Sequence, residues 1–231
     1  MINLTILIPA YNEDATILEL LNRIGKQKID GVTIEVLVID DGSTDQTVTL
    51  LEQNADLYTK LIKRPHNGGK GAAIKMGLAE AKGNYILFQD ADLEYDPAEY
   101  PKLLKTVIEY DADVVMGSRM VASQCTRVSY FWHKVGNKVI TLAFNIFNNT
   151  TFTDVYSCYL LYRRDLIDSN SLITDGWEQH AEILSRAVSK AKTMYEVPIS
   201  YYGRTYAEGK KIKAHHAIAV IWTIIIRRLF R

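Results

Sequence analysis

Short runs of apolar and β-branched residues alternate with segments of helical periodicity through the first half of the chain. Four times, such a run ends in a cluster of Gly, Asp or Asn and leads into a helical segment, a rhythm typical of βαβ units on a parallel sheet. The predicted strands are residues 4–9, 33–40, 61–63, 85–89 and 113–116. The pattern therefore predicts an α/β fold with a mostly parallel central sheet flanked by helices.

Helices are predicted between these strands from their apolar stripes and capping residues. The stripe of the first helix comprises Ile17, Leu20, Leu21 and Ile24. Asp14 precedes this stripe and can cap the helix. Ser43 and Gln46 have capping-box spacing before the second helix. Asp96, which is followed by a proline, is typical of an N-cap residue.

The second half is less regular, but no composition shift, linker or repeat separates it as a second domain. The elements predicted there are helices over residues 131–147 and 178–191, a strand over 159–162, and a strand over 195–202 that Pro198 breaks. Residues 203–213 are polar and rich in Gly and Lys, which predicts a loop. We therefore predict one domain over residues 1–213 and an amphipathic C-terminal helix over residues 214–231.

The apolar run of the C-terminal helix, residues 217–226, is about half of the roughly 20 residues that a bilayer-spanning helix needs. One helical face comprises Ile218, Ile221, Trp222, Ile225 and Leu229, and the basic residues near its end are Arg227, Arg228 and Arg231. A basic, Trp-bearing helix of this length suits the surface of a membrane with anionic headgroups. The alternatives are a terminal helix packed on the core and a contact between two copies in a homodimer.

Composition excludes several classes of protein. The 231 residues are 48% hydrophobic and 23% charged, as in ordinary globular proteins. The 27 Lys and Arg residues balance the 27 Asp and Glu residues, so no basic field favours nucleic acid. Cys125 and Cys158 are too few for a disulfide scaffold or a four-thiolate zinc site. Because the N-terminus also lacks a secretory signal, we expect a reducing, cytoplasmic compartment.

Acidic side chains dominate the ends of the predicted strands, where the loops of a parallel sheet gather and bind ligands. Asp40 and Asp41 end the second strand, and Asp90 and Asp92 follow the fourth. Hard carboxylate oxygens suit Mg²⁺ or Mn²⁺, and such an ion completes its shell with water and substrate phosphates. A nucleotide diphosphate is therefore the expected partner, against the alternative that Asp90 and Asp92 are solvated turn residues.

The glycine-rich stretch of residues 67–71 matches neither of two well-known phosphate-binding motifs. A P-loop requires Ser or Thr directly after its Lys, whereas Lys70 is followed by Gly71. The dinucleotide fingerprint requires a third Gly where this chain has Ile74, which excludes a dinucleotide-dependent oxidoreductase. The stretch instead predicts a tight strand-to-helix turn from which Lys70 could face a phosphate.

Short motifs along nearly the whole chain carry a family resemblance. The first four are Ile-Pro-Ala-Tyr-Asn-Glu at residues 8–13, Val-Ile-Asp-Asp-Gly-Ser-Thr-Asp at 38–45, Asn-Gly-Gly-Lys-Gly at 67–71 and Phe-Gln-Asp-Ala-Asp-Leu at 88–93. In order and spacing, these motifs resemble the family 2 glycosyltransferases of GT-A fold, which implies a Rossmann-like α/β domain. Residues 117–119, 153–154, 159–164, 196–204 and 208–212 resemble the dolichyl-phosphate mannose synthase, or polyprenyl-phosphate glycosyltransferase, branch of that family.

The resemblance implies functional roles at the matching positions. Contacts to a nucleotide-sugar donor are implied for Pro9, Ala10, Tyr11, Glu13, Asp40, Asp41, Lys70, Asp90, Ala91 and Asp92. Asp90 and Asp92 are the implied ligands of Mg²⁺ or Mn²⁺, and catalytic roles are implied for Asp92, Arg119, Arg204 and Lys210. The chain departs from the branch at two positions: it has Glu94 where many members have Gln, and Gly209 where their loop often has Ser. These departures leave the identity of the donor sugar open.

The implied chemistry is displacement at an anomeric carbon with inversion, and the acceptor decides which residues it requires. A hydroxyl acceptor needs a carboxylate base, for which the candidates are Asp154, Asp175, Glu178 and Glu182. A polyprenyl phosphate, with a second pKa of about 6, is already anionic and needs cations instead. The candidate cations are Arg119, Arg127, Arg204, Lys210 and Lys211. They favour a polyprenyl or dolichyl phosphate acceptor, with a hydroxyl acceptor and an inactive nucleotide-binding subunit as alternatives.

Overall fold

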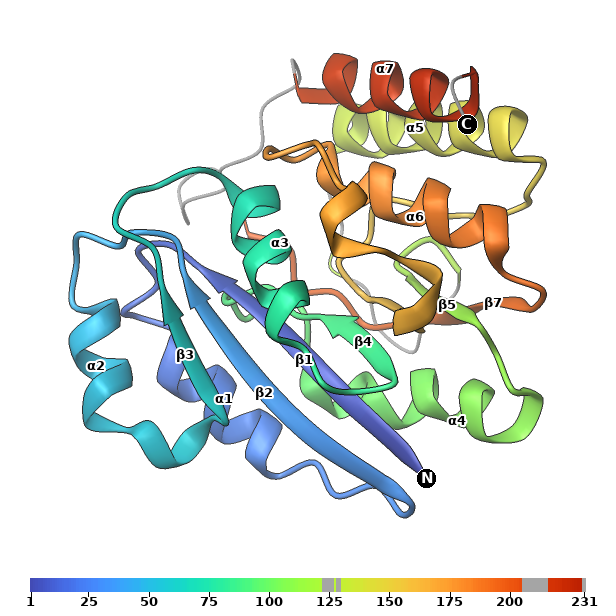
Figure 1. Ribbon diagram of the computed structural model, residues 1–231. Helices are drawn as coiled ribbons and strands as arrows, with labels where there is room; N and C mark the ends of the chain where they lie inside the picture. The colour runs from blue at the N-terminus through green and yellow to red at the C-terminus, as the bar shows by residue number, and fades with distance from the viewer. Residues whose placement is uncertain (122–126, 128–129, 205–215, 230–231) are drawn as a thin grey trace.

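The computed structural model describes residues 1–121, 127, 130–204 and 216–229. The described residues form a seven-stranded sheet flanked by helices, with the strand order β3-β2-β1-β4-β6-β5-β7 (Figure 1). The strands are β1 (Ile2–Ala10), β2 (Val32–Asp40), β3 (Lys60–Lys63), β4 (Tyr85–Phe88), β5 (Val114–Ser118), β6 (Leu160–Arg163) and β7 (Met194–Pro198). The α-helices are α1 (Ile17–Gly25), α2 (Thr47–Gln53), α3 (Lys70–Glu80), α4 (Tyr100–Tyr110), α5 (Phe131–Asn148), α6 (Gln179–Lys190) and α7 (His216–Leu229). Short 3₁₀ helices are η1 (Ala55–Leu57), η2 (Pro97–Glu99), η3 (Arg164–Leu166) and η4 (Ser169–Ser171).

Most neighbouring strands are parallel, as the sequence predicts. β1 pairs in parallel with β2 and β4, β2 with β3, and β5 with β7. Among the described strands, β6 is the exception, because it runs antiparallel to both β4 and β5. The start of β6 therefore lies at the sheet edge where the other strands end. This reversal brings residues 154–159 to the same edge as the loops that follow β1, β2 and β4.

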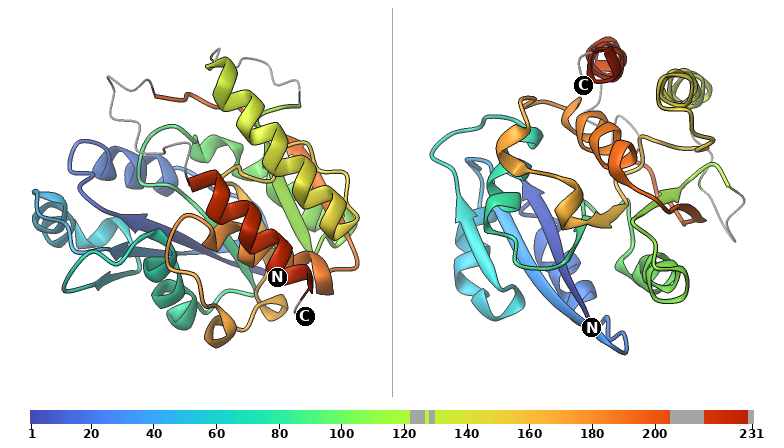
Figure 2. Two further views of the ribbon diagram at one scale, coloured as in Figure 1. Left: turned by 90° about the horizontal axis from the view of Figure 1, so that it is seen from above. Right: turned by 45° about the vertical axis from the view of Figure 1, so that its right-hand side comes forward.

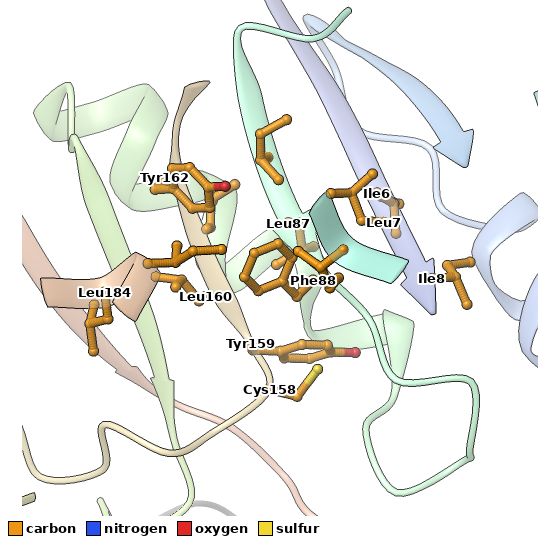
Figure 3. Packing of buried hydrophobic residues seen from close by; sticks show 14 of the residues in the cluster. Ile6, Leu7, Ile8, Leu87, Phe88, Cys158, Tyr159, Leu160, Tyr162 and Leu184 are labelled. Atoms are coloured by element: carbon orange, nitrogen blue, oxygen red, sulfur yellow. The ribbon is translucent and has the colours of Figure 1, made fainter. Parts of the chain in front are cut away.

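The core is built around the central strands. Leu87 and Phe88 of β4 are buried between the apolar side chains of β1 and those of β6 (Figure 3). The ring of Phe88 lies 5.8 Å from that of Tyr162, measured between centroids, in an edge-to-face contact that stabilises aromatic pairs. Since these strands are packed on both faces, the loops at their carboxyl ends start from a rigid frame.

The predicted helices are present, although one predicted cap of the first helix is wrong. α1 buries the predicted stripe of Ile17, Leu20, Leu21 and Ile24. Its N-cap residue is Thr16 rather than Asp14, and no side chain caps it. Asp96 caps η2 as predicted, because its carboxylate accepts a hydrogen bond from the backbone N–H of Ala98.

The capping box predicted for the second helix is also wrong. α2 begins at Thr47, and its N-cap residue Gln46 makes no side-chain cap. The hydroxyl of Ser43 instead accepts a hydrogen bond of 3.0 Å from the backbone N–H of Asn12. The loops after β1 and β2 touch each other, so Ser43 bonds across strands rather than within its own helix.

α5 and α7 lie side by side on the outside of the molecule, beyond α6 (Figure 2). α7 packs on the core through Val220 and Ile224, which are buried. Two residues of its predicted apolar face, Ile218 and Trp222, are 73% and 63% exposed. Within the described part of the chain, no helix is long and apolar enough to cross a membrane.

Some predicted features lie outside the described residues. They are Cys125, residues 205–213 of the predicted loop, which include the candidate cations Lys210 and Lys211, and Arg231. The predictions for these residues therefore stay predictions.

Candidate active site

A cavity of about 460 Å³ opens at the sheet edge where β1, β2 and β4 end. The predicted site residues that line it are Pro9, Ala10, Tyr11, Glu13, Asp41, Lys70, Asp90, Ala91, Asp92, Arg119 and Arg204. Asp40 is not among the lining residues, and Lys210 lies outside the described residues. The fold thus gathers into one cavity side chains that are far apart in the sequence.

Lys70 and Asp90 form an ion pair inside this cavity. Lys70 is the first residue of α3, and Asp90 follows β4, so the parallel sheet places them together. Burial disfavours the ammonium, but the neighbouring Asp90 carboxylate outweighs burial and raises the pKa of Lys70. Burial likewise works against the carboxylate, yet Lys70 holds the pKa of Asp90 below its ordinary value. Both groups are therefore charged at neutral pH.

Asp92 pairs with Arg204 and lies in different surroundings from Asp90. Burial, Asp90 and Glu94 raise the pKa of Asp92 to about 7, although Arg204 opposes them. Glu94 also holds Arg204, since it accepts hydrogen bonds from the Arg204 backbone N–H at 2.9 Å and from its Nε at 3.0 Å. The sequence identifies Glu94 only as a departure from the family pattern, yet this residue anchors the segment that carries Arg204.

Asp90 and Asp92 fit a divalent ion that arrives with a phosphate ligand. Among the described residues, no group of three or more His, Cys, Asp or Glu side chains is arranged to hold a metal ion. Mg²⁺ commonly takes only one or two protein carboxylates and completes its shell with water and substrate phosphates. Because Lys70 and Arg204 already neutralise the two carboxylates, an ion must compete with these cations for them.

Asp41 and Asp40 play different parts at the end of β2. The carboxylate of Asp41 lines the cavity and accepts hydrogen bonds from the backbone N–H groups of Gly68 at 3.1 Å and Gly69 at 2.9 Å. It thereby holds the glycine-rich turn that precedes Lys70. Asp40 is buried and closes its own turn, because its carboxylate accepts from the backbone of Gly42. Its predicted contact with a nucleotide stays a prediction.

Arg119 and Asp154 form a buried ion pair at the wall of the cavity. Arg119 donates from Nε to Oδ2 of Asp154 at 2.7 Å and from Nη2 to Oδ1 at 2.9 Å. Asn137 of α5 donates to the same Oδ1 at 2.8 Å. Burial opposes ionisation, but Arg119 and Asn137 hold the pKa of Asp154 below its ordinary value. Both oxygens of Asp154 are occupied by donors, so this geometry does not suit a general base.

The other three candidate bases do not line the cavity either. Asp175 pairs with Lys75, and Glu178 accepts a hydrogen bond from the backbone N–H of Gly176. Glu182 is fully buried and pairs with Arg186 and Arg227. The expectation that Arg227 meets lipid headgroups is therefore wrong, because its guanidinium turns toward the core. Arg127, a candidate cation, is exposed and donates to the backbone of Gly203.

One end of the cavity is lined by residues to which the sequence motifs assign no role. Those on α5 are Trp132, His133, Gly136, Asn137 and Ile140, and those on α7 are Ala217 and Val220. Tyr156, Trp177 and Tyr201 also line the cavity, but Trp177 and Tyr201 lie beside its charged residues. The Trp177 ring centroid is 5.6 Å from Nζ of Lys70, and the Tyr201 hydroxyl donates to Glu94 at 2.6 Å. The four-residue spacing of Trp132, Gly136 and Ile140 is the signal that places them on one helical face. The cavity therefore joins a charged end to an apolar end.

This arrangement, a mostly parallel sheet with acidic loops at its carboxyl edge, defines a GT-A fold. The chain is similar to glucosyl-3-phosphoglycerate synthase from Mycobacterium tuberculosis, whose structure was solved with Mn²⁺, UDP and phosphoglyceric acid. The TM-score is 0.73 at 20% sequence identity, over 98% of this chain and 78% of that one. At this identity the likeness shows the fold alone.

The chain belongs to glycosyl transferase family 2, whose sequence model matches residues 5–170. It is 29% identical over 209 residues to dolichol-phosphate mannosyltransferase from Pyrococcus furiosus, covering 89% of this chain and 58% of the relative. It is 30% identical over 212 residues to undecaprenyl-phosphate 4-deoxy-4-formamido-L-arabinose transferase from Proteus mirabilis, covering 89% of this chain and 62% of the relative. The chain spans 48% to 62% of the length of the curated relatives it matches.

Proposed function

We propose that this chain transfers a hexose, with inversion at the anomeric carbon, from a nucleotide diphosphate sugar to a polyprenyl phosphate at the cytoplasmic face of a membrane. The observation that carries the proposal is the two-ended cavity. Its charged end holds Lys70, Asp90, Asp92 and Arg204, and its apolar end lies between α5 and α7. The first end fits a diphosphate, and the second fits an isoprenoid chain with its phosphate.

At the charged end, the chain's own cations stabilise the departing nucleotide diphosphate. Asp90 holds the ammonium group of Lys70, and Asp92 holds the guanidinium group of Arg204. Both cations are therefore in place before the donor arrives. Fixed positive charges aimed at a leaving group lower the barrier because they need no reorganisation during the reaction. Mg²⁺ or Mn²⁺ held by Asp90 and Asp92 would neutralise further charge on the diphosphate. The Mn²⁺ and UDP in the Mycobacterium tuberculosis structure support this part of the proposal.

A phosphate acceptor, which needs no base, accounts for the position of the four candidate base residues outside the cavity lining. None of the four candidate base residues lines the cavity, whereas Arg119 and Arg204 do. A phosphate monoester is already anionic near neutral pH, with a second pKa of about 6, and attacks without a base. The two curated relatives named above act, by their names, on dolichol phosphate and undecaprenyl phosphate. These observations favour a lipid phosphate over a hydroxyl acceptor.

The outer faces of α5 and α7 provide a surface for a membrane. The exposed apolar residues there, which we call the α5/α7 apolar surface, are Phe131, Val139, Leu142, Ile146, Ile218 and Trp222. Trp132 is also exposed, and it lines the cavity. Lys134, Lys138 and Arg228 are exposed on the same two helices. Apolar side chains flanked by cations are typical of helices that lie in the plane of an anionic membrane. The surface borders the apolar end of the cavity, where a lipid acceptor would arrive.

Vesicle binding tests this surface. Combining Ile146→Ser and Trp222→Ser should lower partitioning onto anionic vesicles at least about tenfold, because each buried apolar side chain contributes about 1.5–3 kcal/mol. Flotation of the chain with vesicles at low salt is the measurement. Ile108→Ser, at an exposed Ile on α4, is the matched control and should leave flotation unchanged. Equal flotation of all three proteins would exclude membrane docking through these helices.

Transfer assays test the reaction itself. We expect radiolabel to move from one of a panel of UDP and GDP sugars to polyprenyl phosphate in vesicles, and EDTA to reduce the rate at least about tenfold because it removes the ion. Label found only in water-soluble glycan would instead support a hydroxyl acceptor. Nucleotide binding without any transfer would support the inactive binding subunit. Each outcome thus selects one of the three alternatives.

A further inference from the structure

Glu182 of α6 is a fully buried carboxylate that lies outside the cavity and has no part in the proposed chemistry. Its two oxygens share one donor, the backbone N–H of Ile173, at 3.2 Å from Oε2 and 3.4 Å from Oε1, and their other partners differ. Oε2 accepts hydrogen bonds from the backbone N–H of Thr174 at 2.9 Å and from its hydroxyl at 2.6 Å. Oε1 accepts from Nη2 of Arg186 at 2.9 Å and lies 3.2 Å from Nη2 of Arg227. One side chain therefore connects α6 to the loop before it and to α7.

The loop on the Oε2 side, residues 173–178, forms the wall of the cavity next to Lys70. The backbone N–H of Ala72 donates to the carbonyl oxygen of Asp175 at 3.2 Å. A Cβ at Gly69, where φ is 95°, would lie 2.6 Å from that same oxygen, so the loop rests directly on the start of α3. Trp177 lines the cavity, with its ring centroid 5.6 Å from Nζ of Lys70. Fixing Thr174 thus fixes the wall at the charged end.

The helix on the Oε1 side, α7, forms part of the wall at the apolar end. Ala217 and Val220 line the cavity near the start of α7, and Arg227 lies in its last turn. The side chain of Arg227 is only 16% exposed, so its charge is largely removed from water. A buried charge needs a partner, and Glu182 is the carboxylate with which the structure pairs it. The ion pair therefore fixes where α7 lies over the cavity.

We propose that Glu182 is a positioning residue that sets both walls of the cavity, the donor wall through Thr174 and the acceptor wall through Arg227. The names of the two walls rest on the proposed function, in which the charged end takes the nucleotide and the apolar end takes the lipid phosphate. Thr174 and Arg227 contact different oxygens of the carboxylate, so these two contacts can be weakened separately. Arg186 keeps Glu182 paired when Arg227 is removed.

Two substitutions test the Arg227 contact and the Thr174 contact separately. Arg227→Met should raise KM for farnesyl phosphate, a short soluble polyprenyl phosphate, about tenfold, a change worth about 1.4 kcal/mol. It should change the Kd of Mn²⁺ with UDP or GDP less than twofold. Thr174→Val removes one donor to Oε2. It should raise the Kd of Mn²⁺ with UDP or GDP about threefold and leave the KM for farnesyl phosphate unchanged. The soluble acceptor removes any effect of membrane binding on these constants.

Controls distinguish positioning from general loss of structure. Arg227→Lys should restore most of the acceptor KM, and Arg23→Met, which breaks the Arg23–Glu19 pair on α1, should change neither constant. Thermal unfolding followed by circular dichroism identifies any variant that fails to fold. The proposal is overturned if Arg227→Met leaves KM unchanged, or if both variants shift KM and Kd together. Absence of transfer by the wild-type chain would instead reject the proposed function, whereas normal transfer by all variants rejects this inference alone.

Discussion

Asp92→Asn is expected to lower turnover at least about 100-fold, a loss of about 2.7 kcal/mol of transition-state stabilisation. Asn keeps the size of the side chain but removes the negative charge that pairs with Arg204 and that a metal-bound diphosphate requires. The measurement is kcat at saturating donor and acceptor, with Asp56→Asn, an exposed position in η1, as the matched control. Full activity of Asp92→Asn, or of the wild-type chain in EDTA, would exclude the metal role.

The same substitution should leave the fold intact. Burial, Asp90 and Glu94 raise the pKa of Asp92 from its ordinary value of 3.8 to about 7. The folded chain thus prefers the protonated form, whose contribution to stability is complete below pH 3.8 and is lost as the pH rises through about 7. At pH 8 the free energy of unfolding of Asp92→Asn should therefore equal or exceed that of the wild type. A large decrease would mean that the ionised carboxylate has a structural role.

Asp154→Ala is expected to reduce the free energy of unfolding by about 3–5 kcal/mol, because removing one partner of a buried ion pair leaves the other charge without compensation. Asp154 is fully buried, and its loss deprives both Arg119 and Asn137 of an acceptor. Urea unfolding followed by circular dichroism gives the value. Asp165→Ala, an exposed carboxylate in η3, should change it by less than about 0.5 kcal/mol.

That result also determines how activity data at Asp154 are interpreted. Activity lost in an unfolded Asp154→Ala protein does not identify a base. A decrease in stability below about 1 kcal/mol, together with loss of turnover, would contradict the structural role and restore Asp154 as a candidate base.

The charged end of the cavity could be predicted from the sequence because its residues lie in short local motifs. Asp90 and Asp92 follow an apolar strand, and Lys70 follows a glycine-rich turn, so a parallel sheet brings them together. Their pairing, and the raised pKa of Asp92, depend on burial and on distances that no local pattern contains. The pairing of Arg119 with Asp154 also depends on tertiary distances, because the two residues are 35 positions apart in the sequence.

The direction of β6 and the orientation of α7 were not predictable for different reasons. β6 is four residues long and nearly all apolar, and such a run fits a buried strand of either direction. α7 is apolar on more than one face, so helical periodicity alone does not determine which face packs inward. Tertiary contacts determine which face of α7 packs inward. They bury Val220 and Ile224 and leave Ile218 and Trp222 exposed.

The position of α5 and α7 affects how the rate of the proposed reaction depends on its acceptor. Both helices line the cavity on one side and carry exposed apolar residues on the other. On a membrane, the cavity would open toward the headgroups, so the acceptor phosphate would reach Arg119 by lateral diffusion without leaving the bilayer. Turnover would then follow the mole fraction of acceptor in the lipid rather than its concentration in the bulk solution. Dilution of the acceptor with inert lipid would slow the reaction even when the total amount of acceptor is constant.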